Sequence, residues 1–139
     1  MKRKGGERVV LSIVAAKNLN HAFEIVTVGP RKTMKHHMVE EPEGMDGFLY
    51  DTRNELTNYT YYYQFDPYRE TQLEADQVPA IKTFSRSIVK WLEEHGTEEN
   101  RVIQQYGLSF QKIRRFADKL GHVCDAAMEH GYGLSGLGD

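Results

Sequence analysis

The stretch that most constrains this chain is Thr97–Leu120, TEENRVIQQYGLSFQKIRRFADKL, whose residue spacing specifies two helices joined by a tight turn. Gly107 occupies the turn, where a residue that tolerates positive φ is needed. Ser109 suits the N-cap of the second helix, because its hydroxyl can accept a hydrogen bond from a free backbone N–H. Apolar side chains recur at helical spacing on both sides of the turn. They are Val102, Ile103, Tyr106, Leu108, Ile113 and Phe116.

This stretch resembles the helix-turn-helix motif of DNA-binding proteins over about twenty residues. The resemblance implies that the second helix places side chains from its N-terminal part in the major groove of DNA. Gln and Arg can read base edges there, and Lys and Arg can hold phosphates. The predicted DNA-binding residues are Gln111, Lys112, Arg114 and Arg115.

Two features of the same stretch favour an ordinary packing hairpin instead. Ile103 occupies the position where the first helix of such a motif usually carries a small residue. The apolar spacing also continues beyond Phe116 through Leu120, Val123, Cys124 and Ala127, which predicts one helix from about Phe110 to Glu129. The long helix is therefore either a recognition helix or an oligomer interface.

The first half of the chain is rich in β-branched and aromatic residues, which favour strands. The segments predicted to be extended are Arg8–Ala16, Phe23–Val28, Arg31–Glu40, Phe48–Tyr50 and Leu56–Phe65. After them, a helix is predicted from Val78 to His95, ended by Gly96. Strands followed by helices indicate an α+β fold, with an N-terminal antiparallel sheet of four or five strands and a C-terminal three-helix region.

The same pattern predicts how the chain is divided. Residues 1–66 form a β-rich half, 67–77 a linker and 78–130 a helical half, all within one compact domain. The glycine-rich residues 131–139 are expected to be a flexible tail.

Charge and hydropathy limit the possible functions. With 18 Lys and Arg against 20 Asp and Glu, the formal net charge is −2, which is unlike a protein that coats nucleic acid by bulk electrostatics. DNA binding would therefore depend on the local basic patch from Ser109 to Lys119. No apolar run approaches the roughly 18 residues of a membrane span, and no signal peptide is recognisable, so we expect no membrane partner and a cytoplasmic location.

The sequence offers no candidate catalytic or metal site. His36 and His37 would point to opposite faces of an extended segment, so they could not share one metal ion. His122 and Cys124 lie two apart on a helix and face different directions. Glu40, Glu41, Glu43 and Asp46 form an acidic loop that we expect to be solvated. Without a phosphate-binding glycine motif either, the chain is predicted to be a non-enzymatic binding protein that uses no cofactor.

A second hypothesis uses the alternating tyrosines of Leu56–Phe65, which could stack on nucleobases. In this hypothesis the chain is an accessory or inhibitor protein of phage or mobile-element type. It would sequester a nucleotide-like ligand or a host protein as a homo-oligomer. The predicted ligand-binding residues are Arg31, Arg53, Tyr61, Tyr63, Phe84 and Arg115. The tyrosine face could equally be core, an oligomer interface or a site for single-stranded nucleic acid.

Overall fold

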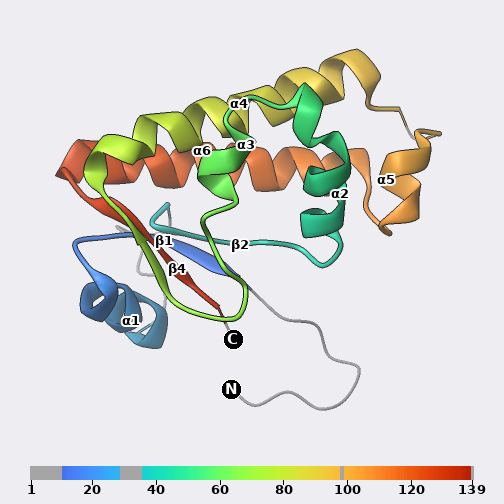
Figure 1. The fold of residues 1–139 in the computed structure, drawn as a ribbon. Helices are drawn as coiled ribbons and strands as arrows, with labels where there is room; N and C mark the ends of the chain where they lie inside the picture. The colour runs from blue at the N-terminus through green and yellow to red at the C-terminus, as the bar shows by residue number, and fades with distance from the viewer. Residues whose placement is uncertain (1–10, 29–35, 98, 139) are drawn as a thin grey trace, which may run out of the picture.

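The computed structural model describes residues 11–28, 36–97 and 99–138. Two long helices, α4 (Val78–His95) and α6 (Phe110–His130), lie side by side and antiparallel, and α6 packs on the sheet (Figure 1). Helix α1 (Leu19–Val28) lies on the other face of the sheet (Figure 1). The fold is therefore a helix–sheet–helix arrangement.

The sheet within these described residues has four antiparallel strands in the order β2-β1-β4-β3, which confirms the predicted α+β class. The strands are β1 (Ser12–Ala16), β2 (Met38–Glu40), β3 (Thr71–Leu73) and β4 (Gly133–Leu137). The longest pairing joins β1 to β4, from Ser12 opposite Leu137 to Ala16 opposite Gly133. The first and last described segments of the chain therefore form the centre of the sheet.

Strand β1 is buried on both faces because its side chains alternate between two apolar clusters. Ile13 and Ala15 belong to the main core beneath the long helices. Val14 and Ala16 belong to a smaller cluster beneath α1, together with Ala22, Ile25 and Leu137. This explains why the strand reads as a continuous apolar run.

The predicted long helices are confirmed. Helix α4 ends at His95 as expected, and α6 runs as one helix one residue beyond the predicted Glu129. Apolar residues recur at helical spacing along each helix, and the two apolar faces pack against each other. Lys82 of α4 forms an ion pair with Asp125 of α6. Shorter helices complete the chain. They are α2 (Met45–Thr52), η2 (Arg53–Glu55), α3 (Tyr59–Tyr62), η3 (Ala75–Gln77) and α5 (Arg101–Gln105).

Three predicted strands are wrong. Phe23–Val28 is part of α1, where Ala22 and Ile25, three residues apart, turn inward. Phe48–Tyr50 lies inside α2. Leu56–Phe65 forms a turn and the short helix α3, with Asn58 at φ 64° and Tyr62 and Phe65 buried three residues apart. In each case the apolar pattern is short enough to fit both the two-residue period of a strand and the 3.6-residue period of a helix, and packing on the core selects the helix.

Two of the four observed strands, β3 and β4, lie where no strand was predicted. The predicted linker contains β3 and η3, and the predicted flexible tail contains β4. A Cβ on Gly133 would lie 2.0 Å from the Leu73 carbonyl oxygen, and one on Gly136 would lie 2.5 Å from Phe65 Cδ1. These glycines allow close packing instead of flexibility. Of the two remaining predicted segments, Arg8–Ala16 contains β1 and Arg31–Glu40 contains β2, and residues 8–10 and 31–35 lie outside the described parts.

Candidate functional site

The turn of the α5–α6 hairpin has the geometry that its sequence predicts. Gly107 has φ +69°, and its N–H donates to the Gln104 carbonyl at 3.0 Å. The Ser109 hydroxyl caps α6 by accepting from the Lys112 N–H at 3.1 Å. Asn100 caps α5, accepting from the Val102 N–H at 2.9 Å. Both helices therefore begin at defined side-chain caps.

Four of the six apolar residues predicted to anchor the hairpin are buried, and Val102 and Tyr106 are half-buried. Ile113 is fully buried, and Ile103 and Phe116 each expose 2% of their surface. Leu108, in the turn, exposes 9%. The bulky Ile103 is thus accommodated at the helix contact, although α5 has only five residues.

Tyr106 fixes the hairpin against α2. Its hydroxyl donates to the Asp51 carboxylate, and a Cβ on Gly47 would lie 2.4 Å from its ring. The hairpin is therefore attached to the rest of the molecule on one side. In Figure 1 it forms the end of the molecule at which α6 begins.

The four predicted DNA-binding residues lie together on the first turns of α6. Gln111, Lys112 and Arg115 are exposed, and Arg114 is half-buried. The Arg114 Nε donates to Asp118 Oδ2 at 3.2 Å. A shallow hollow of about 300 Å³ lies over this surface. It is lined by Phe110, Gln111, Arg114, Arg115, Asp118, Lys119 and His122.

The predicted ligand-binding residues are not brought together. Tyr63 lines a larger cavity, but Tyr61 is exposed outside it and Arg115 lies on the α6 hollow. The Arg53 guanidinium packs 3.8 Å from the centre of the Tyr50 ring. Phe84 is fully buried, and Arg31 lies outside the described residues. Binding of a nucleotide-like ligand by this set stays a prediction.

The larger cavity has a volume of about 610 Å³ and is formed by α2, α3, the segment after α3, the residue before β1 and the residue after β2. Its lining combines tyrosine rings with carboxyl groups. The lining residues are Leu11, Glu41, Asp46, Gly47, Leu49, Tyr50, Tyr59, Tyr62, Tyr63, Gln64, Phe65, Asp66, Pro67 and Tyr68.

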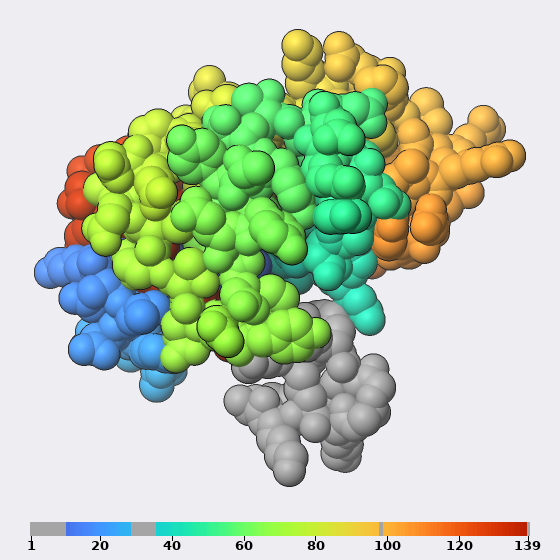
Figure 2. Space-filling view, viewed as in Figure 1, coloured from blue at the N-terminus to red at the C-terminus, as the bar shows by residue number. Residues whose placement is uncertain are grey.

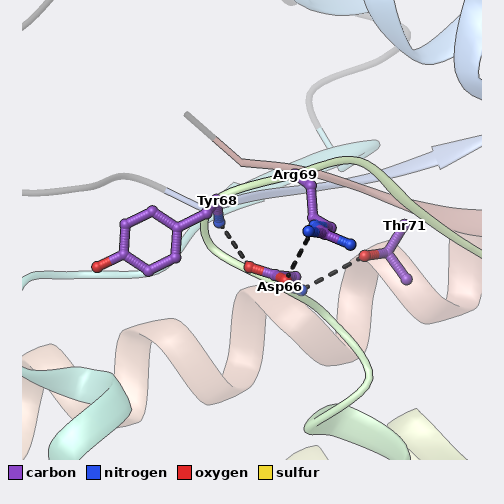
Figure 3. A network of polar contacts seen from close by, with 4 residues as sticks. All are labelled: Asp66, Tyr68, Arg69 and Thr71. Atoms are coloured by element: carbon purple, nitrogen blue, oxygen red, sulfur yellow. Dashed lines mark hydrogen bonds and ion pairs between the residues drawn. The ribbon is translucent and has the colours of Figure 1, made fainter.

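The loop after α3 is held by its own polar contacts, which Figure 3 shows. The Tyr68 N–H donates to Asp66 Oδ1 at 2.8 Å, and Arg69 Nε lies 3.5 Å from Asp66 Oδ2. The Asp66 N–H donates to Thr71 Oγ1 at 3.4 Å. An aspartate side chain that accepts a hydrogen bond from the backbone N–H two residues later stabilises a turn, and the sequence Asp66-Pro67 is typical of such a turn. It holds Asp66 and Tyr68 at the cavity.

Glu41 is the functional candidate that sequence reasoning missed. It was expected to be solvated, but its carboxylate lies in the cavity and accepts a hydrogen bond from the buried Tyr62 hydroxyl. Burial raises the pKa of Glu41 to about 7, although the Tyr62 hydrogen bond opposes this and the nearby Asp46 adds to it. Burial also raises the pKa of Tyr62 well above its ordinary value, so Tyr62 remains a proton donor.

The histidines form ring contacts beside the sheet. His37 lies 5.4 Å from His130, which stacks on Tyr132 at 5.1 Å between ring centres. In the described part of the chain, no group of three or more His, Cys, Asp or Glu could hold a metal ion, and no helix is long and apolar enough to cross a bilayer. No protein-family model, curated protein or solved structure matches this chain.

Proposed function

We propose that this protein is a non-enzymatic DNA-binding regulator whose contact surface is the first half of α6. The observation that carries the proposal is the sorting of side chains around one turn. The anchors Ile103, Leu108 and Ile113 are buried. Gln111, Arg114 and Arg115 line a hollow on the outer side of α6, and Lys112 is exposed next to them. This sorting is what a helix needs in order to dock in a groove while remaining attached to its domain.

Charge along α6 supports the same surface. From Ser109 to Lys119 the chain carries four basic residues against the single acid Asp118. The exposed acids Asp125 and Glu129 lie in the second half of the helix. The positive end of the helix dipole adds to the basic half. The molecule as a whole is slightly acidic, so DNA would approach this end in particular.

The side chains in this surface suit different roles. Arg115 and Lys112 are exposed and suit phosphate contacts, and Gln111 suits an adenine edge. Arg114 is held by Asp118, which orients its guanidinium but also places an acid near the DNA. A single half-site gives weak binding, so the regulator would act as a homo-oligomer on two half-sites about one helical turn apart.

The test is binding of the purified protein to pooled random duplex DNA across a salt series. Affinity should fall steeply with salt, because bound phosphates release counterions. Arg114→Ala combined with Arg115→Ala should reduce the salt slope by about 2 and weaken binding by a few kcal/mol.

Arg69→Ala is the matched control, because Arg69 is exposed in the loop before β3 and lies outside this surface. It should leave both the affinity and the salt slope unchanged. No binding at low salt would rule out the proposal. An equal loss in the Arg69 variant would show that any surface arginine serves and that α6 is not the contact surface.

A further inference from the structure

The tyrosine-lined cavity has the size of a small-molecule site. Its volume of about 610 Å³ falls within the usual range of roughly 300–1,000 Å³. The elements around it, α2 and the chain from α3 to Tyr68, lie on the face toward the viewer in Figure 2 (teal and green). None of the described residues that line it also lines the α6 hollow.

The cavity presents aromatic rings that are only partly buried. Tyr63 and Tyr68 expose 68% and 70% of their surface, and Tyr50 exposes 51%. Tyr59 and Tyr63 lie with ring centres 5.6 Å apart, and Tyr62 in the same lining is buried. Large exposed aromatic side chains gathered at one cavity indicate a binding surface.

The charged residues among the described lining are all acidic. Glu41, Asp46 and Asp66 line the cavity, whereas no Lys, Arg or His of the described residues does. Arg53 and Arg69 approach from outside the lining, against the Tyr50 ring and the Asp66 carboxylate respectively. Neither Glu41 nor Asp46 forms an ion pair with a described residue. A positively charged guest would supply the missing charge.

We propose that this cavity binds a small organic cation, with its alkylammonium or quaternary ammonium group enclosed by the tyrosine rings beside Glu41. The face of an aromatic ring carries partial negative charge and attracts a cation placed within about 6 Å of its centre. The Arg53–Tyr50 contact, 3.8 Å from guanidinium to ring centre, shows a cation on one of these rings within the protein itself. The site is separate from DNA binding and does not depend on it.

Other guests fit the lining less well. The phosphate of a nucleotide would lie among carboxyl groups, and the described lining residues offer no cation to pair with it, at a cost in Coulomb energy. A neutral apolar molecule would fill the space but would leave Glu41 and Asp46 without a positively charged partner. A bare metal ion lacks a ligand cluster among the described residues. The lining therefore selects a guest that is both apolar and positively charged.

Ionisation of Glu41 should couple cation binding to pH. The titratable groups that face it are Tyr62 and Tyr59 from α3 and Asp46 from α2. With a pKa of about 7, Glu41 is largely protonated at pH 6 and largely ionised at pH 8. The ionised form attracts the cation, so affinity should rise across this interval and binding should release protons.

The test is calorimetric titration of the full chain with choline and tetramethylammonium. The neutral isostere of choline, 3,3-dimethyl-1-butanol, and adenosine monophosphate are titrated in parallel. We expect both cations to bind in a saturable manner, with the neutral isostere at least about tenfold weaker. Tyr63→Ala should weaken cation binding about threefold to tenfold, and Tyr63→Phe, which keeps the ring, should restore it.

Tyr61→Ala is the matched control, because Tyr61 is an exposed tyrosine two residues from Tyr63 that does not line the cavity. It should bind cations like the parent chain. Glu41→Gln should remove the rise in affinity between pH 6 and pH 8. No saturable cation binding, equal binding of the neutral isostere, or equal loss in the Tyr61 and Tyr63 variants would each overturn the proposal. DNA binding measured on the same samples reports separately on α6.

Discussion

At the residue scale, Glu41 shows how tertiary contacts change the chemistry of a side chain. It stands in an acidic loop, and nothing beside it in the sequence removes it from water. Its environment comes from Tyr62, which lies 21 positions away and becomes its hydrogen-bond partner only when α3 packs on the core. Sequence reasoning therefore had no local signal for this carboxyl group.

Glu41→Gln should change how stability depends on pH. The folded-state pKa of about 7 lies above the ordinary 4.5, so folding takes up a proton between these values. The stability that Glu41 contributes is present below about pH 4.5 and is lost as pH rises through 7, by up to about 3 kcal/mol. The glutamine variant keeps an acceptor for Tyr62 but cannot ionise. Urea denaturation at pH 5 and pH 8 should find it more stable than the parent at pH 8.

Glu43→Gln is the matched control, because Glu43 is an exposed acid in the same loop. It should follow the pH dependence of the parent chain. Burial of His37 lowers its pKa, which makes stability rise with pH up to about the ordinary value of 6.5, so the comparison with the parent isolates Glu41. A parent chain and a Glu41→Gln variant with parallel stability profiles would show that this carboxyl group is solvated.

At the element scale, the long helices were predictable and the short strands were not. Helices α4 and α6 carry apolar stripes over many turns, so their spacing identifies them locally. Strands β2 and β3 have only three residues each, which is too short for a period to appear. Strand β4 is glycine-rich because neighbouring chain approaches it closely, a cause that lies outside its own sequence.

Gly133→Ala should destabilise the protein by more than about 1 kcal/mol. The added Cβ would lie 2.0 Å from the backbone oxygen of Leu73, so β3 and β4 would have to move apart. Gly121→Ala is the control, because its Cβ would meet only the Ser85 hydroxyl, at 3.3 Å, and alanine favours the helix. Both effects are measured as the change in the free energy of unfolding, determined by urea denaturation of each variant and the parent chain. Equally small effects would show that the last strand is not tightly paired.

At the scale of the whole molecule, the two candidate sites differ in how far sequence could predict them. The α6 surface is built from one helix, so the residues that spacing placed together are together in space. The cavity collects residues from segments that only the folded chain joins. Of the residues predicted for a ligand site, Tyr63 alone lines it among those described. The residues of a site on one helix can be predicted from sequence periodicity, whereas the residues of a site between several elements can be identified only when the fold is known.

Helix α1 gives the predicted homo-oligomer a structural argument. It covers the outer face of the sheet with Ala22 and Ile25, yet it leaves other apolar side chains in water. Phe23, Val26 and Val28 expose 46%, 39% and 61% of their surface. A second copy packing against Phe23 and Val26, which lie three residues apart on one side of α1, would bury both and place two α6 helices on one assembly. Homo-oligomerisation stays a prediction that this surface makes testable.

Phe23→Ser should therefore shift the protein toward the monomer. Sedimentation velocity should find the parent chain as a species larger than 16.0 kDa and the variant near that mass. Loss of a buried aromatic contact weakens association, whereas the fold is retained because Phe23 lies outside the apolar clusters of the monomer. Met128→Ser, which alters an exposed apolar residue on α6, should leave the assembly intact. A monomeric parent chain would contradict the prediction and leave DNA binding to a single half-site, while an assembled Phe23 variant would place the interface elsewhere.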